Sequence, residues 1–194
     1  MLAFSLFEVK CPVAKVYVSI GSNIDRVRNI TIALDVLADS FGALDISSVF
    51  ESEAVGFDGD SFLNLVVGFN TDLGVGDLSS ALKQVEMNNG RLKNAPKFCS
   101  RTLDIDILTY DDVVGKAEGV LLPRPEILEN AFVLWPLAEV AALVEHPELK
   151  MKYLALWGEY KLKAEAKASR PQKLWPVNFI WRSEKLSSAD CALC

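Results

Sequence analysis

Residues 91–106 read RLKNAPKFCSRTLDID and lead into a run of β-branched and apolar side chains. We therefore predict a strand at residues 103–110. Side chains alternate faces along a strand, so Asp104 and Asp106 share one face while the apolar residues between and around them share the other. This stretch predicts a half-buried strand that presents a pair of carboxylates.

The paired carboxylates indicate a cation site. Neighbouring carboxylates on a half-buried sheet repel each other and stay ionised at low cost only with a cation between them. Oxygen ligands with positions left open for substrate phosphates suit Mg²⁺. The alternative is the solvated face of an edge strand next to a solvated loop, but the cations just before the strand favour a polyphosphate site. Those cations are Arg91, Lys93, Lys97 and Arg101.

Composition is that of an ordinary globular protein. The 194 residues suffice for one domain with a substantial core, and 51% of them are hydrophobic and 24% charged. A net charge of −6 argues against general binding to nucleic acid or anionic membranes, which depends on summed positive charge. We expect no nucleic-acid, membrane or obligate protein partner, and anion binding confined to residues 91–101.

Cysteine usage predicts a reducing, cytoplasmic location. The four cysteines, at positions 11, 99, 191 and 194, are too scattered for a disulfide framework. Cys191 and Cys194 form a C-x-x-C, which we interpret as a frayed tail rather than a zinc site because the chain has one histidine and no second cysteine pair. That histidine, His146, is predicted to lie on the surface.

The order of elements predicts an α+β fold. Strand, helix, strand, strand, helix and strand follow one another, which is the βαββαβ core of ferredoxin-like folds, here in three α-β-α layers. Asp25 or Asn29 is expected to cap the first helix, and Asp77 the second. The predicted core elements are strands at 16–20, 46–53, 62–71 and 103–110 and helices at 30–41 and from 77 to 89.

Further elements are expected after this core. We predict short strands near 113–114 and 120–122, a helical segment at 126–144 interrupted at Pro136, and a helix after Pro147 that ends near Tyr160. Residues 1–160 are expected to form a single domain. Residues 161–194 are interpreted as a C-terminal extension that packs locally and is partly disordered.

Four sequence blocks resemble one enzyme family. Residues 97–108, KFCSRTLDIDIL, are similar to the signature of 6-hydroxymethyl-7,8-dihydropterin pyrophosphokinase (2-amino-4-hydroxy-6-hydroxymethyldihydropteridine diphosphokinase), an enzyme of folate biosynthesis. VSIGSN at 18–23, FLN at 62–64 and AFVLWPL at 131–137 occur in the family's order, and the resemblance spans about residues 14–145. It implies an ATP-dependent pyrophosphokinase with the same ferredoxin-like fold. The implied reaction transfers pyrophosphate from ATP to the hydroxymethyl group of 6-hydroxymethyl-7,8-dihydropterin and gives the pterin diphosphate and AMP.

The pterin site is predicted from spacing and from the resemblance together. Phe62 and Asn64 lie two apart on one strand, so Phe62 can cover a flat ring while Asn64 donates to and accepts from its amide edge. The alternative for Asn64 is a hydrogen bond to a neighbouring loop. The resemblance adds Phe132 as a second stacking aromatic. It also implies that Ser52, Glu53 and Val55 contact the pterin edge.

On the nucleotide side, the resemblance implies that Arg91 and Arg101 bind phosphates, which guanidinium forks suit. Together with Asp104 and Asp106 they are the predicted catalytic residues. Asp104 and Asp106 are the predicted ligands of two Mg²⁺ ions brought with ATP. The other predicted ATP contacts are Glu86, Lys93, Phe98, Ile107 and Arg124.

Three positions depart from the family pattern. Cys99 stands where the signature has Gly or Ala, Arg124 replaces a frequent His, and Asn130 replaces an Arg that contacts phosphate in some members. Our hypothesis is that Arg124 supplies the charge missing at Asn130. A binding module that has lost catalysis is one alternative, which the intact acidic and arginine residues oppose. RNA binding on a sheet face is another, which the acidic balance opposes.

Overall fold

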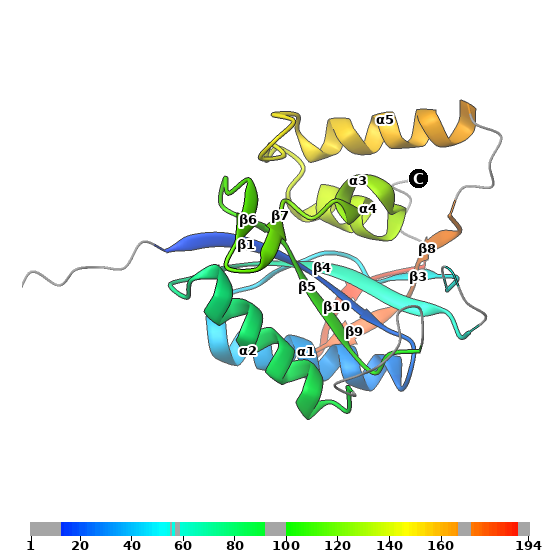
Figure 1. Ribbon diagram of the computed structural model, residues 1–194. Coiled ribbons are helices and arrows are strands. Elements are labelled where there is room, and N and C mark those ends of the chain that lie inside the picture. The colour runs from blue at the N-terminus through cyan, green and yellow to red at the C-terminus, as the bar shows by residue number, and fades with distance from the viewer. Residues whose placement is uncertain (1–12, 55, 57–58, 92–99, 167–171, 190–194) are drawn as a thin grey trace, which may run out of the picture.

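The structure, a computed structural model shown in Figure 1, describes residues 13–54, 56, 59–91, 100–166 and 172–189. Within these residues, the main sheet has six strands in the order β5-β1-β4-β3-β8, with β2 also paired to β4. All of its pairings are antiparallel. The strands are β1 (Ala14–Ser22), β2 (Asp45–Ile46), β3 (Phe50–Ser52), β4 (Phe62–Thr71), β5 (Asp104–Tyr110) and β8 (Leu174–Pro176).

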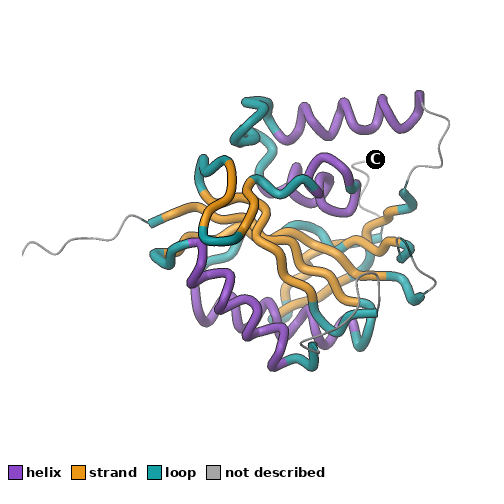
Figure 2. The backbone as a smooth tube through the Cα atoms, viewed as in Figure 1, coloured by secondary structure: helices purple, strands orange, loops and turns teal. Residues whose placement is uncertain are grey.

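Helices cover both faces of this sheet, as Figures 1 and 2 show. Two of them, α1 and α2, lie on one face, whereas α4 and α5 lie on the other, so the predicted three-layer, ferredoxin-like α+β fold is confirmed. No helix among the described residues is long and apolar enough to cross a membrane. Outside the main sheet, the elements up to residue 166 are α1 (Arg26–Phe41), α2 (Val75–Asn88), β6 (Gly115–Ala117), β7 (Val120–Leu122), α3 (Glu126–Glu129), α4 (Ala131–Val140) and α5 (Tyr153–Ala166).

An apolar core fills each interface between the sheet and a helical layer. Val16 of β1 is fully buried with Leu34 of α1 and Leu78 of α2. Tyr17, the next residue, packs on the opposite side of the sheet with Leu134 of α4. The period of two in the strands thus sorts residues between the two cores. It also decides which polar side chains share the face toward α4.

The predicted strand at 46–53 is two short strands rather than one. The N–H of Ser47 donates to the carbonyl oxygen of Val66 at 3.0 Å, and its own Oγ accepts the N–H of Val66 at 2.9 Å. Glu139 of α4 accepts the N–H of Ser48 at 2.8 Å. Side-chain oxygens therefore replace backbone ladder partners between β2 and β3, and the regular strand is interrupted there.

Several predicted helix boundaries were wrong. Asp25 precedes α1 but makes no side-chain capping hydrogen bond, and α2 begins after Gly74, with Asp77 in its first turn. The segment 126–144 breaks at Asn130, which has the extended angles φ −123° and ψ 122°. Pro136, the predicted interruption, lies inside α4. A proline removes one backbone hydrogen bond from a helix, and here the helix continues past it.

The C-terminal part of the chain packs against the body of the protein. Helix α5 continues to Ala166, past its predicted end, and β8 pairs with β3 at the edge of the main sheet. The hairpin of β9 (Phe179–Trp181) and β10 (Glu184–Ser187) contacts α1, where Trp181 Nε1 donates to Asp35 at 3.0 Å. The segment expected to pack locally thus also extends the main sheet and covers a helix.

His146 is buried, so its predicted surface position was wrong. Only 2% of the residue is exposed. Its Nδ1 accepts the backbone N–H groups of Glu148 at 3.3 Å and Leu149 at 3.2 Å. The turn that follows supplies both donors, so His146 holds this turn in place.

Candidate active site

The predicted site residues fall in adjacent rows across three strands. Asn64 of β4 lies opposite Gly21 of β1, which lies opposite Asp104 of β5. In the next row, Ser19 lies opposite Asp106. A Cβ added to Gly21 would lie 3.5 Å from Asn64 Oδ1, so the glycine leaves the floor between the amide and the carboxylate open. One continuous polar strip therefore crosses the sheet.

This strip faces the layer formed by α4. Val66 follows Asn64 by two residues on the same face of β4, and Leu108 follows Asp106 by two on β5. Both pack in the cluster that contains Leu134 and Leu137 of α4. The structure thus brings Phe62, Asn64, Asp104 and Asp106 to one side of the sheet, as their spacing predicted.

Asp104 is the centre of an ion-pair network. Its Oδ1 accepts Arg91 Nη1 at 2.7 Å and Arg101 Nη1 at 2.5 Å. Arg91 Nη1 also donates to Glu86, and Glu86 Oε1 accepts the N–H of Ile105 at 2.7 Å. Arg91 and Arg101, ten positions apart by number, thus converge on one carboxylate at the start of β5.

Glu86 is the most deeply buried carboxylate of this network, with 3% of the residue exposed. The pKa of Glu86 is raised to about 7, mainly by burial and to a smaller extent by the charges of Asp104 and Asp106, while the Ile105 N–H and Arg91 lower it. Glu86 therefore points inward from α2 and ties this helix to the backbone of β5. Its contacts are those of a residue that orients Arg91.

Arg124 forms the second charged contact of the strip. Its Nη2 lies 2.9 Å from Asp106 Oδ2 and 3.2 Å from Glu126, and its backbone N–H donates to Leu108 at 2.9 Å. Burial and the neighbouring Asp104 raise the pKa of Asp106, which Arg124 partly offsets. The buried Nε of Arg124 has no hydrogen-bond partner within the described part of the chain.

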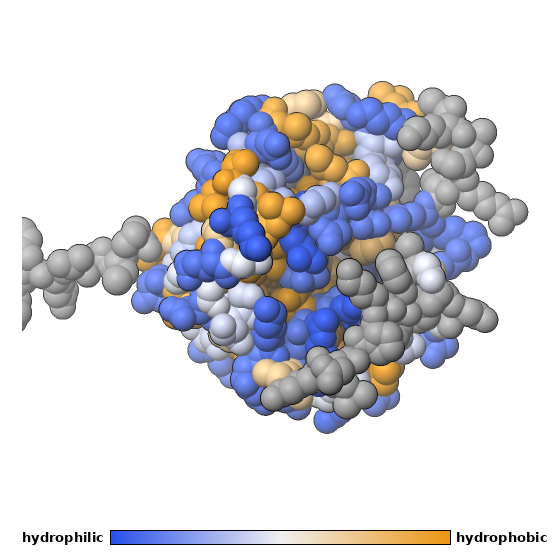
Figure 3. All heavy atoms as spheres, viewed as in Figure 1, coloured by the Kyte–Doolittle hydropathy of each residue, from blue (hydrophilic) through white to orange (hydrophobic). Residues whose placement is uncertain are grey.

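A cavity of about 560 Å³ opens between α2, β5 and β7. Because β5 is an edge strand, side chains from both of its faces reach this space. In the view of Figure 3, hydrophilic side chains gather over the middle of this face, whereas hydrophobic ones show over α4 and α5. The cavity combines a charged group, Lys83, Glu86, Arg91, Asp106 and Arg124, with an apolar group, Leu82, Met87, Ile107, Val120 and Leu121.

At the other end of the strip, the predicted pterin residues come from three elements. Asn64 is 7% exposed, and its Nδ2 donates to Ser52 Oγ of β3 at 3.0 Å. Phe132 is half-buried in the first turn of α4. Glu53 is exposed and pairs with Lys173 at 2.5 Å. Asn64 is thus bonded to a buried strand residue rather than to a loop.

Three predicted site residues, Val55, Lys93 and Phe98, lie outside the described residues, as does Cys99. In the part of the chain that is described, no group of three or more His, Cys, Asp or Glu is arranged to hold a metal ion. Asp104 and Asp106 are therefore a pair, not part of a closed cage. A hard cation bound by them would keep positions for other oxygen ligands.

Comparison with known proteins places this chain in a family. The sequence profile described as 7,8-dihydro-6-hydroxymethylpterin-pyrophosphokinase (HPPK) matches residues 17–142. The chain belongs to the HPPK family. The 2-amino-4-hydroxy-6-hydroxymethyldihydropteridine pyrophosphokinase of Aquifex aeolicus is 38% identical over 136 residues, which cover 69% of this chain and 84% of that protein. The enzyme of the same name from Bacillus subtilis is 33% identical, with 66% and 79% covered.

Solved structures of HPPK domains have the same fold. Wild-type HPPK-DHPS of Plasmodium falciparum aligns with a TM-score of 0.67 at 12% identity and covers 91% of this chain. The same protein with pterin and p-hydroxybenzoate aligns with a TM-score of 0.68 at 11% identity. This chain spans about half of those two chains, 50% and 49%. The resemblance seen in the sequence, and with it the enzyme class, is confirmed by the family match.

Within the region shared with the HPPK family, Asn23 has a role that sequence reasoning missed. Its Oδ1 accepts the N–H of Arg101 at 2.7 Å, and its Nδ2 donates to Asp60 at 3.1 Å and to Ser100 at 3.3 Å. Asn23 is 5% exposed, so it joins the two loops that flank the strip. The signal was a polar residue in the turn after a buried strand, but its partners lie far away in the sequence.

Proposed function

We propose that this chain transfers the pyrophosphoryl group of ATP to the hydroxymethyl group of 6-hydroxymethyl-7,8-dihydropterin in folate biosynthesis. The observation that carries the proposal is the strip that joins Asn64 to Asp104 across Gly21. An amide suited to the pterin edge and a carboxylate suited to bind metal lie on one open floor. Membership of the HPPK family supports the same reaction.

ATP is proposed to enter the cavity beside α2. Leu82, Met87 and Ile107 supply apolar surface for the base, and Arg91 and Arg124 supply positive charge for the phosphates. Each guanidinium has five N–H donors in a fixed fork, so Arg91 and Arg101 can bind phosphate oxygens while they keep their bonds to Asp104. The unpartnered Nε of Arg124 supports a phosphate contact there, and with it the proposed compensation for Asn130.

Asp104 and Asp106 fit Mg²⁺, and we propose two ions at this pair. They lie on one face, their donors are hard oxygens, and the pKa of Asp106 is raised by burial and by Asp104, an unfavourable state that a cation would relieve. Mg²⁺ bound there would neutralise phosphate charge and align the phosphates. Arg91, Arg101 and Arg124 hold the two carboxylates in position for this purpose.

The pterin is proposed to lie against Phe62 and Phe132 with its amide edge toward Asn64 and Ser52. Its hydroxymethyl oxygen then attacks the β-phosphorus of ATP, the bond from that phosphorus to the α-phosphate oxygen breaks, and AMP leaves. The hydroxyl proton passes to solvent, since phosphoryl transfer depends more on positioning and charge stabilisation than on a strong base. Arg91 and Arg101 stabilise the charge that develops on the transferred group.

The proposed partners are therefore ATP and the pterin alcohol. The net charge of −6 and the scattered cysteines support a cytoplasmic enzyme that does not bind nucleic acid. The test is an assay for AMP with the pterin alcohol present or omitted. We expect AMP only when both substrates are present. Tight binding of both substrates by calorimetry without AMP would instead indicate a binding module that has lost catalysis.

A further inference from the structure

Residues 172–176 contact two elements of the proposed pterin site, β3 and the start of α4. These residues lie beyond the family match at 17–142. Leu174 of β8 lies opposite Ser52 of β3, and Ser52 Oγ is the acceptor for Asn64. Lys173 pairs with Glu53 at 2.5 Å. The C-terminal segment is therefore the neighbouring strand of the wall that carries Ser52.

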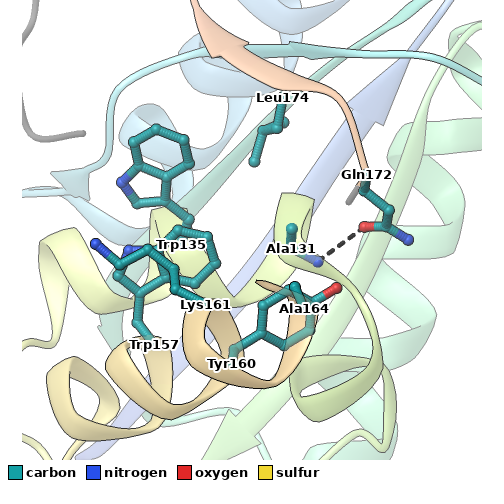
Figure 4. A pocket seen from close by; sticks show the side chains of 8 residues that line it. All are labelled: Ala131, Trp135, Trp157, Tyr160, Lys161, Ala164, Gln172 and Leu174. Atoms are coloured by element: carbon teal, nitrogen blue, oxygen red, sulfur yellow. Dashed lines mark hydrogen bonds between the residues drawn. The ribbon is translucent and has the colours of Figure 1, made fainter. Parts of the chain in front are cut away.

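The same segment holds the start of α4, as Figure 4 shows. Gln172 Oε1 accepts the N–H of Ala131 at 2.9 Å, and Gln172 Nε2 donates to Asn130 Oδ1 at 3.1 Å. Asn130 occupies the N-cap position but makes no side-chain capping bond to its own helix, although Asn is a favoured N-cap residue. The first N–H of α4 is thus satisfied by a residue 41 positions away.

Apolar packing does not fix this contact. A cavity of about 160 Å³ lies beside it, between α4, α5 and β8, lined by Ala131, Trp135, Tyr160 and Gln172 among others (Figure 4). Trp135 stacks on Trp157 at 5.2 Å, and its ring centroid lies 4.6 Å from that of Phe50, so its ring is held by α5 and β3. The two hydrogen bonds of Gln172 link the first turn of α4 directly to the segment that leads into β8.

We propose that Gln172 is a positioning residue for pterin binding. Phe132 directly follows Ala131 and packs against the apolar cluster on the α4 side of the sheet, the side that carries Asn64, so the bond from Gln172 to the Ala131 N–H positions the turn that carries Phe132. The β8–β3 pairing fixes Ser52 through the same short segment. The inference rests on the proposed function, because it concerns the pterin end of that site.

The test compares Gln172→Ala with Gln84→Ala. Gln84 is an exposed glutamine of α2 that donates to Asn88 Oδ1 at 2.8 Å, so it matches the residue type and the bond but lies away from the pterin end. We expect Gln172→Ala to raise KM for the pterin about fivefold, the scale of a lost helix cap. The KM for ATP should stay unchanged, and Gln84→Ala should leave both KM values unchanged.

A conservative variant separates positioning from general destabilisation. Gln172→Glu keeps an oxygen acceptor for the Ala131 N–H, and the amide of Asn130 can rotate to donate to it. A negative charge is also favourable at a helix N-terminus. We expect this variant to restore the KM for the pterin. A pterin KM in Gln172→Ala equal to that of Gln84→Ala, an equal rise in both KM values, or no recovery in Gln172→Glu would overturn the inference.

Calorimetric binding of the pterin alcohol to each variant distinguishes the two proposals. If the wild-type chain binds the pterin but forms no AMP, the proposed function fails, while a weaker affinity confined to Gln172→Ala still supports the positioning role. If the wild-type chain does not bind the pterin, both proposals fail. Unchanged affinity in Gln172→Ala overturns the inference even where turnover confirms the function.

Discussion

The two ends of the candidate site are built in different ways. At the phosphate end, Arg91, Arg101, Asp104 and Asp106 all come from one stretch of chain and meet on β5. At the pterin end, the contacts join β3, β4, α4 and β8, and Gln172 lies 41 residues from Ala131. Local sequence therefore specifies the first end, whereas the second exists only after the whole sheet has formed.

The forces at the two ends differ as well. The phosphate end is a network of charges in which Asp104 accepts two guanidinium groups. The pterin end combines one exposed ion pair, between Lys173 and Glu53, with neutral hydrogen bonds from Asn64 to Ser52 and from Gln172 to Asn130. Charge-assisted hydrogen bonds are roughly twice as strong as neutral ones, so substitutions at the phosphate end should have the larger effects.

The largest expected effect is at the paired carboxylates. Asp104→Ala or Asp106→Ala should lower kcat by on the order of a hundredfold or more, the scale of losing a key electrostatic group. Calorimetry should show pterin affinity reduced far less. Asp112→Ala, an exposed carboxylate in the turn after β5, is the control and should leave kcat unchanged. A loss of only a few-fold at both positions would contradict the assigned roles.

A crossed pair of substitutions would separate the two ends. Asn64→Ala should raise KM for the pterin about tenfold, because hydrogen bonds to the ring edge are lost, with little change in KM for ATP. Arg124→Ala should do the reverse and raise KM for ATP about tenfold, because a charge-assisted contact is lost. Steady-state kinetics with each substrate varied would measure both effects. If both variants affect the same substrate, the two ends are not separate.

The sequence predicted the common face of Asp104 and Asp106 because the information for it is local. Asp104 and Asp106 share a face through the period of two, and that face was set by the apolar residues at 103, 105 and 107. The predicted nucleotide residues Glu86, Arg91, Ile107 and Arg124 line one cavity. Their roles toward ATP stay predictions.

The contacts that the sequence did not reveal are long-range. Strand β8 has three residues, too few for a period to show, and its partner β3 lies over a hundred positions earlier. Nothing near Asn130 in the sequence indicates that its side chain accepts a hydrogen bond from Gln172, 42 positions away. Such features depend on which segments meet, which the local pattern does not encode.

The smallest expected effect concerns Glu86, which supports the phosphate end from behind, and it is an effect on stability. Its pKa is raised to about 7, first by burial, so the folded state binds a proton more tightly than the unfolded chain does. Glu86 therefore contributes stability that is full below about pH 4.5 and is lost as the pH rises through about 7. Protonated Glu86 still accepts the Ile105 N–H, and glutamine is its closest neutral counterpart.

Glu86→Gln should therefore flatten the fall in the free energy of unfolding between about pH 4.5 and 7, by less than about 1.4 kcal/mol per pH unit, the limit for one proton. Urea unfolding at a series of pH values would measure it. The exposed Glu159 of α5 provides the control Glu159→Gln, which should keep the wild-type slope. Part of the slope should remain in Glu86→Gln, because burial also raises the pKa of Asp106. An unchanged slope in Glu86→Gln would mean that Glu86 is charged in both the folded and the unfolded chain over this range, and that Arg91, rather than burial, decides its protonation. The phosphate end would then be held by a full ion pair between Arg91 and Glu86 behind Asp104, and its contrast with the pterin end would be sharper still.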